Sequence, residues 1–124
     1  MTDEKPCPKM ILVIEDETAV FRVIKRQLES EGYAVIGETT GAAAIESVTR
    51  SRLFAVLCDL GLPDMSGFDV LSQIHAMKPD LPVIVVTGHH EEDEARRAFA
   101  LGAADYITKP IDFNNLRNAL LLNS

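Results

Sequence analysis

The strongest constraint on how this chain can fold is an alternation of short apolar runs with amphipathic segments, repeated along its 124 residues. The apolar runs are rich in β-branched residues and cover residues 10–14, 34–36, 54–58, 81–86 and 106–108. Runs of this kind are typical of strands that are buried on both faces of a sheet. Each is followed by apolar residues at helical spacing, so the sequence predicts five strands alternating with five helices.

The predicted helices have one apolar face each, and residues at their ends mark their boundaries. Gly32 and Gly102 follow the first and fourth helices as stop residues, while Thr40 and Asp112 are suited to cap the second and fifth. The apolar faces comprise Val20, Phe21, Ile24 and Leu28; Ala44, Ile45 and Val48; Val70, Leu71, Ile74 and Met77; and Phe113, Leu116 and Leu120.

The fourth helix, predicted over residues 91–101, begins with acidic residues, which favour a helix N-terminus. Two ion pairs at i,i+4 spacing should support it. They join Glu92 to Arg96 and Asp93 to Arg97.

Parallel strands require crossover connections, and the helices in those connections cover both faces of the sheet. The alternation therefore predicts a doubly wound α/β domain with a five-stranded parallel sheet. Hydrophobic residues make up 47% of the chain and charged residues 25%, which fits one compact domain. We expect residues 9–124 to form this domain and the polar, proline-containing residues 1–8 to form a flexible tail.

Charge and composition exclude several classes of function. The net charge of −7 argues against direct binding of nucleic acids, which requires clustered Lys and Arg. The sequence has no apolar run long enough to span a bilayer and no signal-peptide pattern at its start, so we expect a cytoplasmic protein without membrane contact. Cys7 and Cys58 lack the number and spacing of a disulfide framework or zinc site, and Cys58 should be a small buried hydrophobic residue.

In doubly wound sheets, ligands bind at the carboxyl ends of the strands. Polar residues follow four of these ends: Glu15, Asp16 and Glu17 after the first strand, Asp59 after the third, Thr87 and Gly88 after the fourth, and Lys109 and Pro110 after the fifth. Carboxylates brought together repel one another unless a divalent cation neutralises them, and oxygen ligands suit Mg2+. Such a cation with a lysine and a hydroxyl fits phosphoryl transfer, for which Asp59 is the best-placed nucleophile.

Four motifs, in this order, resemble the receiver domains of response regulators, which are the phosphoacceptor half of two-component signalling. They are Ile11–Glu17, Asp59–Gly67, Val86–Gly88 and Gly102–Pro110, and the similarity extends from Lys9 to about Leu121. The resemblance implies a CheY-like, flavodoxin-like sheet with the strand order 2-1-3-4-5. It also implies a phosphoprotein that carries an aspartyl phosphate.

The resemblance assigns the phosphoacceptor and the metal ligands to particular positions. It implies Asp59 as the phosphoacceptor and Mg2+ as the cofactor, with the Asp16 and Asp59 side chains and the Gly61 carbonyl as direct ligands. Glu15 stands where many relatives have Asp. Because its side chain is longer, we expect Glu15 to act on the metal through water.

The resemblance also implies the residues that sense the phosphoryl group. Lys109 should contact its oxygens and, before phosphorylation, pair with the acidic cluster; the Lys109–Pro110 peptide bond should be cis. Thr87 should donate its hydroxyl to the same group, and its movement would leave space into which Tyr106 rotates. This switch would reshape the face formed by the helix at 91–101, the strand at 106–108 and the last helix.

Gly88 and His89, which follow Thr87 in the sequence, should modulate the lifetime of the acyl phosphate. Gly88 lacks a side chain and would leave the phosphoryl group open to water, although it could simply shape a turn. His89 lies at a position that varies in the family, where a side chain can influence attack by water.

Taken singly, the other site residues have structural explanations: Asp59 as a helix cap or loop acid, Glu15 and Asp16 as the start of a helix, Thr87 as a strand end, Lys109 as a solvated cation and Tyr106 as a packed aromatic. The four motifs together favour the functional interpretation.

The donor of the phosphoryl group should then be a sensor histidine kinase or a histidine phosphotransfer protein. The face that Tyr106 reshapes should control a downstream partner or form a homodimer. The domain would catalyse only its own phosphorylation and dephosphorylation.

Two other functions stay open at the level of sequence. A receiver-like module that binds partners without phosphorylation usually lacks the acids or the lysine, which are present here. A phosphohydrolase with an aspartyl nucleophile usually has the pattern Asp-x-Asp, but residue 61 is Gly.

Overall fold

The computed structural model describes residues 8–88 and 91–123, and it contains one five-stranded parallel sheet in the order β2-β1-β3-β4-β5. The strands are β1 (Met10–Ile14), β2 (Ala34–Glu38), β3 (Ala55–Cys58), β4 (Val83–Thr87) and β5 (Asp105–Thr108). The helices between and after them are α1 (Thr18–Ser30), α2 (Gly41–Arg50), α3 (Gly67–Met77), α4 (Glu92–Ala100) and α5 (Phe113–Leu122). The predicted doubly wound fold and strand order are confirmed.

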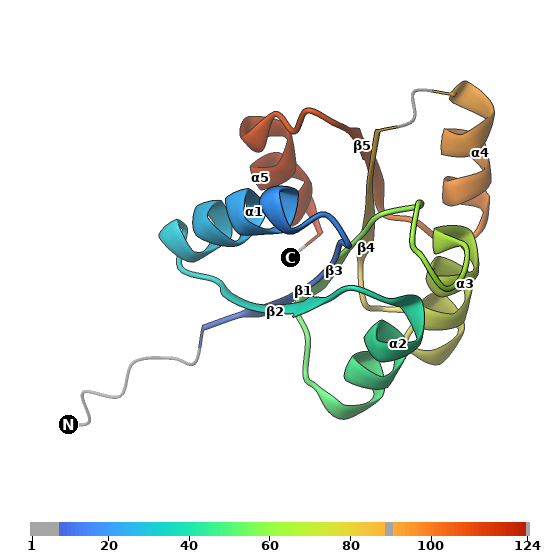
Figure 1. The fold of residues 1–124 in the computed structure, drawn as a ribbon, viewed down its shortest axis with the longest axis horizontal. Helices are drawn as coiled ribbons and strands as arrows, with labels where there is room; N and C mark the ends of the chain where they lie inside the picture. Colours follow the sequence, from blue (N-terminus) through green and yellow to red (C-terminus); the bar gives the residue numbers. More distant parts are fainter. Residues whose placement is uncertain (1–7, 89–90, 124) are drawn as a thin grey trace.

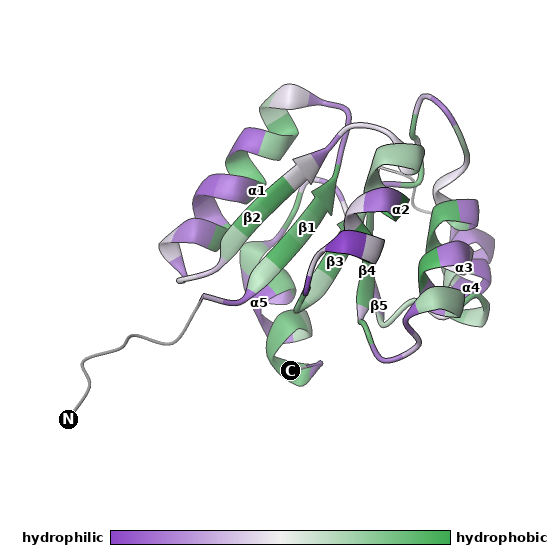
Figure 2. Ribbon diagram, turned by 90° about the horizontal axis from the view of Figure 1, so that it is seen from below, coloured by the Kyte–Doolittle hydropathy of each residue, from purple (hydrophilic) through white to green (hydrophobic). Residues whose placement is uncertain are grey.

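The sheet lies between two layers of helices (Figure 1). Helices α1 and α5 cover one face, while α2, α3 and α4 cover the other. Each face has its own hydrophobic core: the first lies under α1 and α5, and the second lies under α2, α3 and α4. Because successive side chains of a strand point to opposite faces, β1 contributes Ile11 and Val13 to the first core and Leu12 and Ile14 to the second. Figure 2 shows that the strands are mostly apolar, whereas the helices also carry hydrophilic residues.

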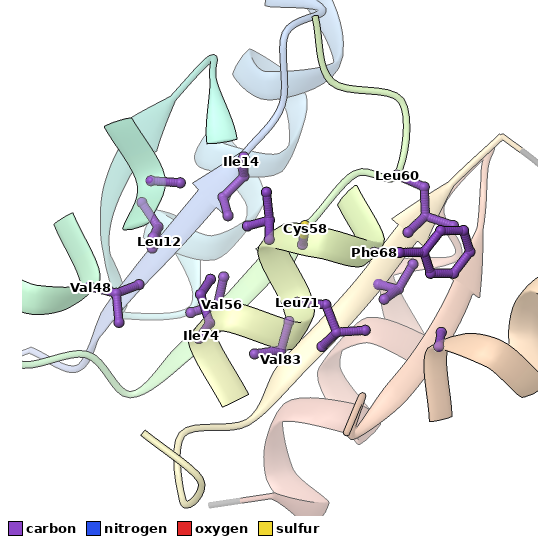
Figure 3. Packing of buried hydrophobic residues seen from close by; sticks show 14 residues of the cluster. Leu12, Ile14, Val48, Val56, Cys58, Leu60, Phe68, Leu71, Ile74 and Val83 are labelled. Carbon is purple, nitrogen blue, oxygen red and sulfur yellow. The ribbon is translucent and has the colours of Figure 1, made fainter. Parts of the chain in front are cut away.

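The second core is continuous across three strands and three helices. Figure 3 shows Leu71 and Ile74 of α3 over the sheet, with Val48 of α2 at one end of the cluster and Phe68 at the other. Cys58 lies fully buried within it, as expected for a small hydrophobic residue. Burial raises the pKa of its thiol to about 12, with a further contribution from the negative charges of Asp59 and Glu15.

Helix boundaries follow the signals in the sequence. The Thr40 hydroxyl accepts a hydrogen bond from the Ala43 N–H at the start of α2, and the Asp112 carboxylate accepts hydrogen bonds at the start of α5. Gly32 and Gly102 follow α1 and α4 with φ angles of 94° and 108°, in the left-handed region that favours glycine. These four predictions are confirmed.

Other local predictions differ from the structure. Strand β4 begins at Val83 rather than Leu81, because Pro82 has no N–H for the ladder and Leu81 donates instead to the Lys78 carbonyl. Met77, expected on the buried face of α3, is 40% exposed because it is the last residue of that helix.

One of the two ion pairs predicted in α4 is also wrong within the described residues. Arg96 bonds to Glu92 at 2.9 Å and lies 3.7 Å from Asp93. Arg97 instead places its guanidinium 4.2 Å from the centroid of the Phe68 ring on α3. Packing between helices therefore determines where Arg97 points.

None of the helices within residues 8–88 and 91–123 has the length and apolar character needed to cross a membrane.

Candidate functional site

The carboxyl ends of β1, β3, β4 and β5 bring four polar side chains to one edge of the sheet. Glu15 follows β1, Asp59 follows β3, Thr87 is the last residue of β4, and Lys109 follows β5. Asp59 is 6% exposed and Glu15 only 3%, so both carboxylates have lost most of their contact with water. Buried carboxylates require a compensating cation, which makes this edge the candidate functional site.

Lys109 supplies positive charge to this site. Its Nζ lies 2.8 Å from a Glu15 carboxylate oxygen, 3.0 Å from Asp59 and 3.7 Å from Glu17. Burial alone would lower the pKa of Lys109, but the hydrogen bonds to Glu15 and Asp59 and the negative charges of both groups together outweigh it and raise that pKa. The ammonium group is therefore held in its charged form beside Asp59.

Glu15 experiences the opposite balance. Burial raises the pKa of its carboxyl group, and the hydrogen bonds from Lys109 and from the Glu17 N–H only partly offset this. The nearby charge of Asp59 raises the pKa further. One lysine thus leaves the two buried carboxylates incompletely balanced, and an additional cation would favour their charged forms.

Backbone hydrogen bonds fix the positions of the site residues. The Asp59 N–H donates to the Ile14 carbonyl at 3.0 Å, which extends the pairing of β3 with β1 by one residue. The Lys109 N–H donates to the Thr87 carbonyl at 2.7 Å, which ties the end of β5 to the end of β4. The Lys109–Pro110 peptide bond is cis, in agreement with the resemblance.

Three carboxylates could together hold a metal ion. Oxygen atoms of Glu15, Glu17 and Asp59 lie within 4.8 Å of one another. Carboxylate oxygens are the donors that Mg2+ prefers, so the donor set fits that ion. Asp16, predicted as a direct ligand, is exposed and lies outside this group of three, and its role as a ligand stays a prediction.

Gly61 lies in the loop that follows Asp59. Its N–H donates to a carboxylate oxygen of Asp59 at 3.1 Å, and it forms an antiparallel bridge with Ser66. Gly67 closes the loop, and a side chain there would collide with the backbone of Asp59 and Leu60. The loop is therefore compact and brings the Gly61 backbone back to the Asp59 carboxylate.

The predicted switch residues lie on adjacent strands. Thr87 is fully buried and is in register with Thr108, while Tyr106 is partly buried against the core beneath α3 and α4. Burial raises the pKa of the Tyr106 hydroxyl, as do the negative charges of Glu94 and Glu91. Gly88 is exposed, with open space where a side chain would project. His89 lies outside the described residues.

Two acidic residues of this region, Glu17 and Asp64, were not predicted from the sequence as separate contributors. Glu17 was visible only as part of an acidic run, and Asp16 was the expected ligand instead. The Asp64 carboxylate accepts hydrogen bonds from Gly41 and Ala42 of α2, contacts between residues more than twenty positions apart. No local pattern identifies such a contact. The one feature of the sequence that could have pointed to Asp64 was an acidic residue directly after Pro63.

Comparisons with known proteins agree with this geometry. Residues 11–121 match the family model of the response regulator receiver domain. The transcriptional regulatory protein ZraR of Escherichia coli K12 is 34% identical over 110 residues, which cover 89% of this chain and 25% of that protein. The chain thus spans a quarter of the length of that curated relative.

Solved structures extend the agreement to three dimensions. A response regulator receiver domain protein from Clostridium thermocellum superposes with a TM-score of 0.87 at 32% identity, over 93% of each chain. A response regulator protein from Burkholderia pseudomallei, solved with a phosphorylated aspartic acid, a calcium ion and citrate, gives 0.85 at 28% identity, over 90% of this chain and 66% of that one. The family match over most of the chain, together with these structures, shows that the chain belongs to the receiver domains of two-component response regulators.

Proposed function

We propose that this receiver domain accepts a phosphoryl group on Asp59 from a sensor histidine kinase or a histidine phosphotransfer protein. The observation that supports this most directly is the buried Asp59 carboxylate, 3.0 Å from the Lys109 ammonium and beside Glu15. The phosphorylated aspartic acid of the Burkholderia pseudomallei protein is consistent with the same chemistry here.

In the transfer, one Asp59 carboxylate oxygen forms a bond to phosphorus as the bond from phosphorus to the donor breaks. With phosphohistidine the leaving group is an imidazole nitrogen, and with acetyl phosphate it is acetate. Lys109, already at hydrogen-bond distance from Asp59, stabilises negative charge on the transferred oxygens. Thr87 contributes its hydroxyl to the same group. In dephosphorylation, a water molecule attacks phosphorus as the bond from phosphorus to the Asp59 oxygen breaks, and inorganic phosphate and the free carboxylate are released.

The acidic cluster is proposed to hold Mg2+. Asp59, Asp16, the Gly61 carbonyl and Glu15, the last through water, are the residues assigned to it, and Glu17 adds a third carboxylate near Asp59 and Glu15. When bound, the ion supplies positive charge that offsets the repulsion between carboxylates and phosphoryl oxygens. The residues themselves position Asp59 and exclude water from its buried side.

Phosphorylation would change the output through Thr87 and Tyr106. A modification shifts a conformational equilibrium only as far as it favours one state, and the hydrogen bond from Thr87 to the phosphoryl group supplies that difference. Tyr106 would then rotate inward and alter the surface formed by α4, β5 and α5. That surface is the proposed contact for the downstream partner, and a candidate surface for a homodimer.

The other two functions receive less support. The acids and the lysine are not only present but assembled around Asp59, which argues against a module that works without phosphorylation. The place of a second catalytic acid, two residues after Asp59, is occupied by Gly61. This is unfavourable to a general phosphohydrolase.

Incubation with Mg2+ and acetyl phosphate, followed by intact-mass measurement, tests the proposal. Wild type should gain the mass of one phosphoryl group, and the gain should be absent with EDTA or in Asp59→Asn. A gain that persists in Asp59→Asn would contradict the assignment. Rapid release of phosphate from varied monoesters would indicate a hydrolase instead. His89→Ala should retain the gain but change its rate of decay.

A further inference from the structure

The loop between Asp59 and Gly67 is fastened to α2 by one carboxylate. Asp64 Oδ1 accepts a hydrogen bond from the Gly41 N–H at 2.8 Å, and its Oδ2 accepts one from the Ala42 N–H at 3.0 Å. These are the first two N–H groups of α2, which have no partner within the helix. Both carboxylate oxygens are thus used to join the loop to a helix on the other side of the site.

A second contact reinforces this attachment. A side chain at Gly41 would come within 2.5 Å of Met65 Cγ and 2.7 Å of a Val70 methyl group. Met65 follows Asp64 directly, so two consecutive loop residues pack against the first turn of α2. The first turn of α2 therefore holds the tip of the loop, residues 64 and 65, in place.

The opposite end of the loop carries a proposed metal ligand. Gly61 is bridged to Ser66, the residue after Met65, and its N–H contacts the Asp59 carboxylate at 3.1 Å. A displacement of residues 64–66 is therefore passed through the bridge to Gly61. The carbonyl of Gly61 depends in this way on contacts made by Asp64 at α2.

Helix α2 is itself anchored to the other side of the site. Ser47 donates a hydrogen bond of 2.5 Å to the Glu38 carboxylate at the end of β2, and the Glu38 carbonyl accepts the Glu15 N–H at 3.0 Å. The helix thus connects the segment that carries Glu15 with the loop that carries Gly61. Helix α2 can therefore fix the positions of Glu15 and Gly61 relative to each other.

We propose that Asp64 is a positioning residue for the metal site, which fixes the Gly61 carbonyl by fastening the loop to the first turn of α2. This inference rests on the proposed function, because it assumes that the acidic cluster binds Mg2+. The hydrogen bonds from the Gly41 and Ala42 N–H groups also hold the pKa of Asp64 below its usual range, because they favour the charged carboxylate.

The test compares Mg2+ affinity with stability in matched variants. Asp64→Ala should raise the Mg2+ dissociation constant about tenfold, the lower end of the loss seen when groups that orient metal ligands are removed. Thr40→Ala deletes the other side-chain cap of the same helix, at Ala43, without touching the loop. Asp69→Asn removes one exposed negative charge from the start of α3. Both controls should leave the dissociation constant within about twofold, since neither orients a metal ligand.

Isothermal titration with MgCl2 at constant ionic strength gives the affinities, and urea unfolding gives the stabilities. Equal affinity losses in Asp64→Ala and Thr40→Ala would show that Asp64 is only a helix cap, and equal losses in Asp64→Ala and Asp69→Asn would show an effect of charge alone; either result overturns the inference. If Asp64→Ala does not fold, Asp64→Asn, which keeps one acceptor oxygen, takes its place with a smaller expected loss. Wild type that binds no Mg2+ would contradict the proposed function itself.

Discussion

At the scale of single residues, the site depends on Lys109, whose ammonium group contacts the buried carboxylates of Glu15 and Asp59. Lys109→Met removes this cation and leaves two like charges close together. The variant should lose about 3 kcal/mol of stability, at the lower end for breaking a buried ion pair because the Lys109 side chain is still 15% exposed. Urea unfolding at pH 7 without Mg2+ measures the loss.

Titration gives this prediction a second check. The pKa of Glu15 is raised in the folded protein, so the folded state binds a proton at Glu15 more tightly than the unfolded chain does. Glu15 therefore lowers the stability as the pH rises from its unfolded pKa through its folded pKa. The deficit of Lys109→Met should therefore shrink as the pH falls toward the pKa of Glu15. Combining it with Asp59→Asn should also restore part of the stability. A variant as stable as wild type at pH 7 would show that Lys109 does not balance these charges.

At the scale of elements, α4 is held to α3 by Arg97, which stacks on the Phe68 ring. Arg97→Ala should cost about 0.5–1 kcal/mol, the usual value of a cation–π contact near the surface. Arg96→Ala is the matched control, because the ion pairs of Arg96 with described residues, Glu92 and Asp93, are exposed and are worth less. Equal midpoints for the two variants in urea unfolding would contradict a stabilising role for the stacked pair.

The same elements show what local sequence can and cannot predict. The strand order and the caps at Thr40 and Asp112 follow from periodicity, from the family motifs and from residue types that act over one turn. Arg97 was assigned to Asp93 because that pairing depends only on spacing along one helix, whereas its actual contact depends on how α3 and α4 pack. Tertiary packing overrides local preference at such positions.

The site residues also fall into those that local sequence and topology predict and those that depend on tertiary structure. Asp59, Thr87 and Lys109 could be predicted to converge because each lies at or just after the carboxyl end of a parallel strand, and the topology places those ends together. The approach of Glu17 in place of Asp16 depends on the path of the backbone just before α1. The clamp from Asp64 to α2 depends on the shape of a loop, which periodicity does not determine.

At the scale of the whole molecule, the proposed switch links Asp59 to the surface of α4, β5 and α5 through Thr87. Phosphorylation should shift the backbone amide resonances of residues 92–108 in wild type. Thr87→Ala should still accept the phosphoryl group, because Asp59 and Lys109 are intact, but these shifts should be much smaller. Two-dimensional NMR before and after phosphorylation measures both. Equal shifts in wild type and Thr87→Ala would show that the signal takes another route.

The proposed function requires that Asp59 carries the phosphoryl group. After phosphorylation, borohydride reduces an acyl phosphate to an alcohol, so the modified residue becomes homoserine and can be located by peptide mass mapping. We predict one modified position, Asp59, in wild type treated with Mg2+ and a phosphoryl donor. Modification at Asp16, Glu15 or Glu17, or at no residue, would contradict this account.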